Sequence, residues 1–459
     1  MPIIAGILII FLLQLVSSFI ITNSEKRGIL ITLLILMFFT YGIVYETIQN
    51  LTGIELLLVY GLIFILSTFF LIRTKRNVYT LNKVLNIIAI SFILINIVQL
   101  ITFEIDNDEN LFAFDNEQPL LNLDNKPDIY YIILDGYANS TILKEFYKYN
   151  NKEFEDFLIK KGFYVSTESR SNYPETLLSL NSSLNMDYFN VTNKPLERVL
   201  YISIQNTKVM QLLNKASYKI INLSSSGYIA NMEAADLNVN YASFLTSEFY
   251  ALLFRYTMLR IVKGHIPSID LYRERIFKTF SKLGDIKREM AKSDDPTFVF
   301  AHILLPHPPY VFGTDGELPK GSYRIDLKYW GHSVKSMELY KNQLVFLNKM
   351  MMKVIDNIVS NARDNSIIIL QSDHGPYHII DNNRNNVRMK NFTAFLLPKG
   401  DENIFYNSIT PVNIFRLIFN HYFKTHYDLL EDKNYYPENK PPHKFLDVTK
   451  DINNITVSK

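Results

Sequence analysis

The 459-residue chain contains no cysteine. This absence excludes disulfide bonds, zinc sites built from thiolates and a cysteine nucleophile. The chain also lacks an excess of charge of one sign, because 47 basic and 45 acidic residues give a formal net charge of +2. Proteins that bind nucleic acids carry a basic surface that neutralises phosphates. No nucleic-acid partner is therefore expected.

Long apolar runs are confined to the first quarter of the chain. Four runs are each close to the ~20 residues that a helix needs to cross the core of a bilayer. The first run has no basic segment before it and no small-residue cleavage motif after it, so it is not expected to be a removable signal peptide. Residues 1–104 are therefore predicted to form an anchor of four transmembrane helices, at 2–21, 29–44, 54–72 and about 84–103.

The loops between these runs differ in charge. The loop at residues 46–53 has no Lys or Arg, and the segment after Phe103 is acidic. The two other loops are basic and are expected in the cytoplasm by the positive-inside rule. The chain after Phe103 is then external, periplasmic or extracellular, on a multi-pass protein of the cell membrane. The basic residues are Lys26, Arg27, Arg73, Lys75, Arg76 and Lys83.

The rest of the sequence has the pattern of a globular α/β domain. A polar linker at 105–126 precedes it, and a C-terminal extension at 431–459 follows it. Over 127–430, apolar runs alternate with helical patterns, which predicts a mostly parallel central sheet. The expected strands are residues 128–134, 218–223, 297–305, 366–370 and 393–397, and the clearest helices are 337–358 and 413–422.

Chemically reactive side chains follow three of the expected strands. Asp135 follows the first strand, His307 the third, and Asp373 and His374 the fourth. In parallel α/β sheets, ligands bind beyond the carboxyl ends of the strands. Asp and His are suited to zinc, manganese or calcium, and adjacent ligands at a strand end can share one ion. Taken singly, the Asp-Gly at Asp135 is also typical of a turn.

Thr176 stands near the predicted start of a helix, after Pro174 and before an apolar helical pattern. A helix start offers free backbone N–H groups and a positive dipole end, which stabilise an anion such as phosphate. A hydroxyl next to a divalent cation is deprotonated more easily and attacks phosphorus or sulfur. The structural alternative is that Thr176 is an N-cap residue.

From residue 126 to about 424, the chain resembles the alkaline phosphatase/sulfatase superfamily. The anchor with an external domain is similar to lipoteichoic acid synthases and phosphoethanolamine transferases, which use Thr nucleophiles. The resemblance implies an α/β domain of the alkaline phosphatase type and a metal-dependent enzyme. Its motifs are Asp135-Gly136, Thr176, His307-Pro-Pro-Tyr310 and Ser372-Asp373-His374-Gly375.

The resemblance also assigns roles to individual residues. Asp135, Thr176, Asp373 and His374 are implied to share one divalent ion, zinc or manganese, with calcium and magnesium as further candidates. Thr176 is then the catalytic nucleophile, and His307 binds the substrate.

Lys390 and His378 are further candidates for substrate binding. Lys390 precedes the expected strand 393–397, where related enzymes place a basic residue near the substrate. His378, with His302 and His332, is also available for a second metal, but no clear match to a second ligand set is present. One metal ion is therefore expected.

A membrane-anchored, sulfatase-like hydrolase or transferase is the expected function. It cleaves or transfers a phospho-group of an envelope lipid or glycan through Thr176, with the bilayer as its partner. Sulfatases mature a Cys or Ser within Cys/Ser-x-Pro-x-Arg, whereas Thr176 stands in Glu-Thr-Leu-Leu-Ser. A sulfuric ester hydrolase and a non-catalytic membrane scaffold are the alternatives.

The aromatic segment 247–261 is expected either to lie on the bilayer or to pack as a core helix.

Overall fold

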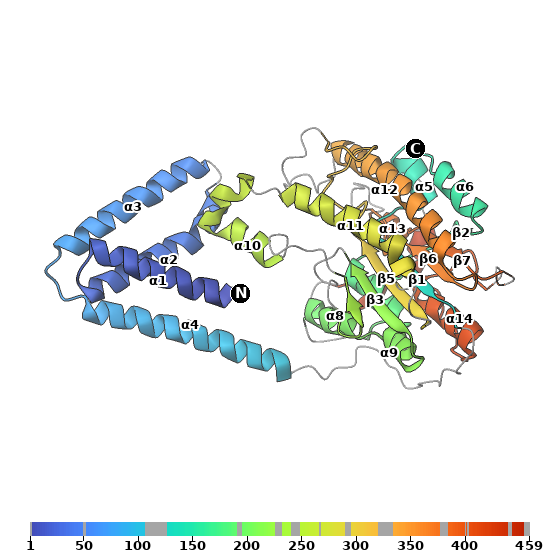
Figure 1. Ribbon diagram of the computed structural model, residues 1–459, viewed down its shortest axis with the longest axis horizontal. Coiled ribbons are helices and arrows are strands. Elements are labelled where there is room, and N and C mark those ends of the chain that lie inside the picture. Colours follow the sequence, from blue (N-terminus) through green and yellow to red (C-terminus); the bar gives the residue numbers. More distant parts are fainter. Residues whose placement is uncertain are drawn as a thin grey trace. The chain divides into compact units, whose positions relative to one another are not determined.

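The chain forms two compact units in the computed structural model (Figure 1). One comprises Met1–Glu109 and Phe244–Ser268, and the other Asn110–Ser243 and Ile269–Lys459. The chain therefore passes between the units after residues 109, 243 and 268. The structure describes residues 2–48, 52–105, 126–190, 195–224, 232–239, 248–265, 268–289, 295–319, 334–376, 384–399, 401, 404–438 and 443–453.

The first unit contains the predicted N-terminal helices. By length and composition, α2, α3 and residues 79–99 of α4 can each cross a membrane. The described part of α1 gives a shorter apolar helix, Ile9–Ile20, so the predicted count of four spans is not confirmed. Thr52 and Glu55 form a capping box that starts α3. The helices are α1 (Pro2–Ile20), α2 (Ser24–Thr47), α3 (Gly53–Arg73) and α4 (Tyr79–Ile105).

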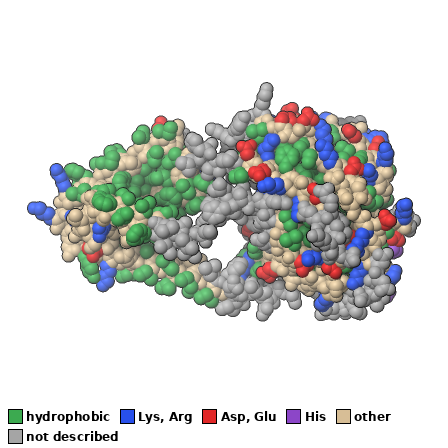
Figure 2. Space-filling view, viewed as in Figure 1, with side chains coloured by type: hydrophobic (Ala, Val, Ile, Leu, Met, Phe, Trp, Pro, Cys, Tyr) green, Lys and Arg blue, Asp and Glu red, His purple; other side chains and the backbone are tan. Residues whose placement is uncertain are grey.

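Apolar side chains of these helices face outward. Phe19 is 83% exposed and Ile54 is 72% exposed. Figure 2 shows hydrophobic side chains over much of the visible face of this unit. A continuous apolar surface of this extent is unfavourable in water and suits contact with lipid. Anchoring in a membrane is therefore the physical explanation for these helices.

The first unit also contains α10 (Glu248–Tyr256) and the 3-10 helix η2 (Met258–His265). Both contact α2, and Figure 1 shows α10 beside it. At Gly42 the backbones approach so closely that a Cβ would collide with the main chain of Arg255 and Tyr256. This segment lies within the range 127–430 in sequence, but it packs on a membrane-length helix rather than in the core of the α/β unit.

The second unit is built on a seven-stranded sheet with the order β2-β7-β6-β1-β5-β3-β4. The pairs β6–β1, β1–β5, β5–β3 and β3–β4 are parallel, whereas β7 is antiparallel to both of its neighbours. The predicted mostly parallel sheet is confirmed. The strands are β1 (Ile129–Leu134), β2 (Tyr164–Ser166), β3 (Lys219–Ser224), β4 (Leu237–Asn238), β5 (Thr297–Ile303), β6 (Ile367–Gln371) and β7 (Thr393–Leu396).

Helices cover both faces of this sheet. Tyr130 and Ile132 of β1 belong to one buried cluster, together with residues of α12, whereas Tyr131 and Ile133 belong to another, with residues of α14. A strand that is buried on both faces has a continuous apolar sequence, as β1 does. The helices are α5 (Ser140–Phe146), α6 (Lys152–Lys160), α7 (Thr176–Asn185), α8 (Leu196–Gln205), α9 (Lys208–Lys215), α11 (Ser268–Glu289), α12 (Val334–Asn361), α13 (Arg384–Met389), α14 (Pro411–Phe423) and α15 (Thr449–Asn453).

The C-terminal extension adds a two-stranded antiparallel sheet, β8 (Tyr435–Pro437) with β9 (Phe445–Asp447). The backbone of Tyr435 donates a hydrogen bond to the Asn172 carbonyl, 2.8 Å away. Tyr435 also stacks on Tyr173, with the ring centroids 5.9 Å apart. The extension therefore holds the loop that leads into Thr176.

Candidate metal centre and nucleophile

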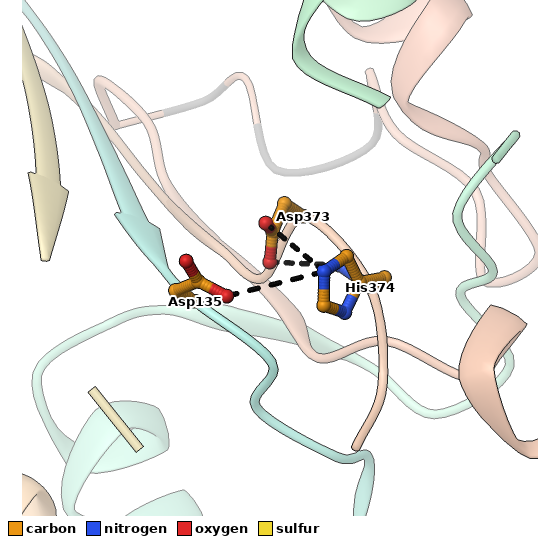
Figure 3. Close-up of side chains that lie close together, drawn as sticks. All are labelled: Asp135, Asp373 and His374. Carbon is orange, nitrogen blue, oxygen red and sulfur yellow. Dashed lines mark hydrogen bonds and ion pairs between the residues drawn. The ribbon is translucent and has the colours of Figure 1, made fainter. Parts of the chain in front are cut away.

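The carboxyl ends of β1 and β6 bring the central side chains together. The two strands are parallel neighbours, and Ile133 pairs with Gln371. Two residues further on, Asp135 and Asp373 therefore lie at the same level of the sheet edge. Figure 3 shows their carboxylates and the His374 ring facing one another. The topology thus converts two sequence motifs more than two hundred residues apart into one cluster.

Asp135, Asp373 and His374 form a buried group whose potential ligand atoms all lie within 4.8 Å of one another. Nε2 of His374 is 3.9 Å from Oδ1 of Asp135 and 3.5 Å from Oδ2 of Asp373. The Asp135 side chain is almost fully buried, and the other two are fully buried. Within the part of the chain that the structure describes, this is the one cluster of His and acidic residues with metal-ligand spacing.

Backbone groups orient the three side chains. Oδ1 of Asp373 accepts hydrogen bonds from the backbone N–H groups of Gly136 and His374, each at 2.9 Å. Gly136 has a φ of 71°, a conformation that glycine adopts without strain. Nδ1 of His374 lies 2.8 Å from the Gly375 carbonyl, which only accepts, so Nδ1 carries the proton. Nε2 of a neutral His374 then presents a lone pair to the two carboxylates.

These residues fit a divalent cation. Oδ1 of Asp135 and Oδ2 of Asp373 are buried and have no hydrogen-bond partner among the described residues. Burying an ionised oxygen without a partner is costly. Two such oxygens and an imidazole lone pair facing one point repel each other unless a cation lies between them. The mixed oxygen and nitrogen set suits zinc or manganese.

The electrostatics of the cluster favour the ligating forms of these groups. Burial raises the pKa of the Asp135 carboxyl, but His307, His302 and His374 outweigh it and hold that pKa well below its usual range. Burial lowers the pKa of His374 below its ordinary 6.5, although Asp373 opposes this shift. An ionised carboxylate beside a neutral imidazole is the state that binds a metal.

Thr176 is the first residue of α7, and Glu175, with extended backbone, is the N-cap. The alternative that Thr176 is itself the N-cap is therefore wrong. Oγ1 of Thr176 lies 3.3 Å from Nε2 of His374. Ser179, one turn along, donates a hydrogen bond of 2.6 Å to the Asp373 carbonyl and holds α7 against the cluster. The half-buried hydroxyl thus faces the site at a helix start.

Two histidines from β5 and the loop after it approach Asp135. His302, fully buried on β5, has Nε2 3.4 Å from Oδ2 of Asp135. The backbone N–H of His307 donates to the Asp135 carbonyl at 3.1 Å. Nδ1 of His307 lies 2.6 Å from the carbonyl of Pro308, to which it donates. His307 therefore lies beside Asp135, and His302, which the sequence offered only for a second metal ion, contacts the Asp135 carboxylate.

The segment before β7 also borders the site. The backbone of Gly375 donates to the Arg388 carbonyl at 2.7 Å, and Asn139 donates to the Lys390 carbonyl at 3.3 Å. Arg388 is buried, and its charge contributes to the lowered pKa of His374. Lys390 is half-buried, and burial lowers the pKa of its ammonium group. No hydrogen bond or ion pair among the described residues joins the Lys390 side chain to the cluster. His378 and His332 lie outside the described residues.

Comparisons with known proteins give structural neighbours only. No family model matches the chain, and no curated protein matches it. Similar solved structures include the C-terminal periplasmic domain of EcEptC from Escherichia coli, with 13% identity, 72% of this chain and 96% of that chain covered, and a TM-score of 0.47. Another is the C-terminal periplasmic domain of phosphoethanolamine transferase EptC from Campylobacter jejuni, with 12% identity, 67% and 92% coverage, and a TM-score of 0.40.

A third is a protein in the alkaline phosphatase superfamily from Vibrio parahaemolyticus, with 12% identity, 68% and 71% coverage, and a TM-score of 0.41. These structures bear names of the classes that the sequence resembles. Identities this low leave the chemistry to be inferred from the side chains of this chain.

Proposed function

We propose that the protein is a membrane-anchored, metal-dependent enzyme that transfers or hydrolyses a phospho-group through Thr176. The observation that carries this proposal is the 3.3 Å approach of Oγ1 of Thr176 to Nε2 of His374, which also faces the carboxylates of Asp135 and Asp373. A structural threonine has no need of two buried carboxylates beside it that each leave one oxygen without a hydrogen-bond partner among the described residues. A nucleophilic threonine, by contrast, is activated by an adjacent base or by a metal ion that such carboxylates can bind.

Asp135, Asp373 and His374 would hold one divalent ion, with Thr176 as a further ligand. When bound, this ion supplies positive charge that favours the ionised hydroxyl and offsets charge on the substrate. The protein's own part is to fix the donors. Hydrogen bonds with the backbone orient the Asp373 carboxylate and the His374 ring. His302 contacts Oδ2 of Asp135.

The proposed reaction has two steps. Oγ1 of Thr176 loses its proton to solvent and bonds to phosphorus, while the bond from phosphorus to the leaving alcohol breaks and that alcohol takes up a proton. The first helical bond of α7 runs from Ser179 to Glu175, so the preceding backbone N–H groups have no partner within the helix and can donate to phosphate oxygens. A second hydroxyl, from an acceptor or from water, then loses its proton to solvent and bonds to phosphorus, while the bond from phosphorus to Oγ1 breaks and Oγ1 takes up a proton, which restores Thr176.

Four basic side chains are proposed to attract or bind the substrate. His307 is half-buried beside Asp135 and contributes to the potential there. Lys390 and His378 keep the weaker role of binding the transferred group or its substituents. The buried charge of Arg388 near His374 adds to the attraction for an anionic substrate.

The location follows from the anchor. We propose residues 1–104 as four spans, 105–126 as a linker, 127–430 as the catalytic domain and 431–459 as an extension, with the domain outside the cytoplasm. An anchored enzyme meets a lipid substrate at a high effective concentration. The substrate is therefore proposed to be a phospholipid or an envelope glycan.

The test is to capture the covalent intermediate. The purified full chain, loaded with zinc or manganese, is incubated separately with labelled anionic phospholipid, a sulfate ester and a simple phosphodiester. Label on Thr176 that passes to a glycerol or glycan acceptor supports a transferase, and release to water supports a hydrolase. Turnover of the sulfate ester alone would replace the phosphorus chemistry with that of a sulfatase. No label and no turnover with any substrate would favour a scaffold.

A further inference from the structure

The segment of α10 and η2 is held on the membrane-length helices by an apolar cluster. Met258 packs against the buried group formed by Met37 and Tyr41 of α2 with Leu56 and Tyr60 of α3. The rings of Tyr41 and Tyr60 meet edge to face, with their centroids 5.4 Å apart. Tyr41 also donates a hydrogen bond to the Gly53 carbonyl. The contact therefore lies where α2 ends and α3 begins.

A cation adds a polar contact at the same end. Nη1 of Arg260 is 2.6 Å from Oε1 of Glu46. The guanidinium group lies over the ring of Tyr45, 4.3 Å from its centroid. A partly exposed ion pair and a cation–π contact are each weak stabilising interactions. Together with the close approach at Gly42, they fix the segment to the end of α2 that lies opposite the basic residues Lys26 and Arg27.

The same segment leaves apolar side chains uncovered. Leu252 and Tyr256 are 46% and 37% exposed, and their spacing of four residues puts them on one face of α10. Ile261 of η2 is 39% exposed. The ends of α2 and α3 expose further apolar side chains, including Ile43 at 53% and Ile54 at 72%. The exposed apolar face of α10 and η2 thus lies in the first unit, beside the ends of α2 and α3. Those helix ends carry an apolar surface that suits contact with lipid.

We propose that residues 248–265 are a second membrane attachment of the α/β unit, with Leu252, Tyr256 and Ile261 in the outer lipid–water interface of the bilayer. Interfacial helices combine such an apolar face with basic residues near anionic headgroups. The segment carries Arg255, Arg260 and Lys263 but only one acidic residue, Glu248.

The chain leaves the α/β unit after residue 243 and returns after residue 268. The catalytic unit is therefore tied to the membrane through this segment as well as through the linker at 105–126. This inference goes beyond the proposed chemistry and does not depend on the metal site.

The absence of cysteine allows a direct test in the full chain. Single cysteines replace Leu252 and Ile261 and, as controls on the α/β unit, Tyr201 and Leu446, which are 45% and 51% exposed. Each is labelled with an environment-sensitive fluorophore and reconstituted into phosphatidylcholine–phosphatidylglycerol vesicles that contain doxyl-labelled lipid. Quenching at positions 252 and 261 should exceed that at the controls by about twofold or more, because interfacial side chains lie within ~10 Å of the acyl boundary. Equal quenching at all four positions overturns the proposal.

A second experiment tests the attachment itself. A site for a specific protease is inserted after residue 115, and cleavage is verified by the masses of the two fragments. The C-terminal fragment should stay with the membranes in a high-salt wash, and the pair Leu252→Glu and Ile261→Glu should release it. The matched pair Tyr201→Glu and Leu446→Glu should be retained like the parent. Release of the parent fragment contradicts the proposed attachment. Circular dichroism of the released material checks that it is folded.

Discussion

Oγ1 of Thr176 and Nε2 of His374 lie 3.3 Å apart, although 198 residues separate them in the chain. The hydrogen bond from Nδ1 to the Gly375 carbonyl fixes the His374 ring, so Nε2 faces both the Thr176 hydroxyl and the carboxylates. Any group that His374 binds is therefore a neighbour of Thr176. This relationship makes the proposed nucleophile and the proposed metal centre one site.

Removing the Thr176 hydroxyl should abolish turnover. Thr176→Ala leaves no oxygen to bond to phosphorus, and loss of a nucleophile lowers kcat by roughly three orders of magnitude or more. Thr176→Ser keeps the hydroxyl and should retain part of the activity. Steady-state rates with the substrate identified by labelling measure both.

Thr167→Ala is the matched control, because Thr167 is exposed and bonds only to Asn407 among the described residues. It should behave like the parent protein. If Thr176→Ala also turns over at the parental rate, another group is the nucleophile.

Changing the cluster should remove bound metal. Asp373→Asn removes the charge of one of the four proposed ligands and His374→Ala deletes another, so the metal content of the purified protein should fall from about one ion per chain to near zero. Asp401 and His421 form a similar Asp–His pair, 2.9 Å apart and partly exposed. Asp401→Asn should leave the metal content unchanged. Full occupancy in both cluster variants, measured by inductively coupled plasma mass spectrometry, contradicts the assignment.

His302 should tune the metal site without binding the ion. Its Nε2 contacts Oδ2 of Asp135, and groups that orient a ligand typically change metal affinity by about 10- to 100-fold. His302→Gln keeps an N–H group at similar reach and should weaken binding less than His302→Leu. Isothermal titration with zinc or manganese compares them. Equal affinity in the parent and the leucine variant would reduce His302 to a packing residue.

The predictable parts of the fold are the long, strongly patterned ones. The expected strands at 128–134, 218–223, 297–305, 366–370 and 393–397 correspond to β1, β3, β5, β6 and β7. Burial on both sheet faces makes these strands continuously apolar. The strands β2 and β4 have three and two residues, too few for a periodic pattern, and were not expected.

The site was predictable where chemistry follows a strand directly, as for Asp135 and Asp373. His302 was predicted only as a possible residue of a second metal site, because it lies inside β5, where the sequence alone does not tell a core histidine from a functional one. The available signal was a lone histidine within an otherwise apolar strand. Arg388 and the docking of residues 248–265 on α2 depend on long-range packing, which no local pattern encodes.

Metal binding should depend on pH in a defined direction. Burial lowers the pKa of His374 below 6.5, so its ring stays neutral, and able to bind, to a lower pH than an ordinary histidine. The pKa of Asp135 is also depressed, so that carboxylate stays ionised. Occupancy should therefore be flat from about pH 8 down to pH 6.5 and decline only below that, as protons compete for the ligands.

The metal-free protein provides the control for this prediction. Its unfolding free energy should also fall below pH 6.5, because the unfolded chain takes up the His374 proton at a higher pH than the folded one. A loss of half the metal above pH 7 contradicts the lowered pKa.

The last prediction concerns the side of the membrane on which the α/β unit lies. The basic loops at Lys26 and Arg27 and at residues 73–83 are expected in the cytoplasm, since positively charged loops resist translocation. With four spans, both the N-terminus and the catalytic unit are then external. Alkaline phosphatase is active only outside the cytoplasm, so a phosphatase fused after Lys459 should be active. Green fluorescent protein does not become fluorescent when the general export route carries it out unfolded, so a fusion at the same position should stay dark. Replacing Lys26 and Arg27 with Gln removes positive charge that favours the cytoplasmic side. This variant should therefore lower the activity of the fused phosphatase. A fluorescent fusion with inactive phosphatase would place the unit in the cytoplasm and contradict the predicted orientation.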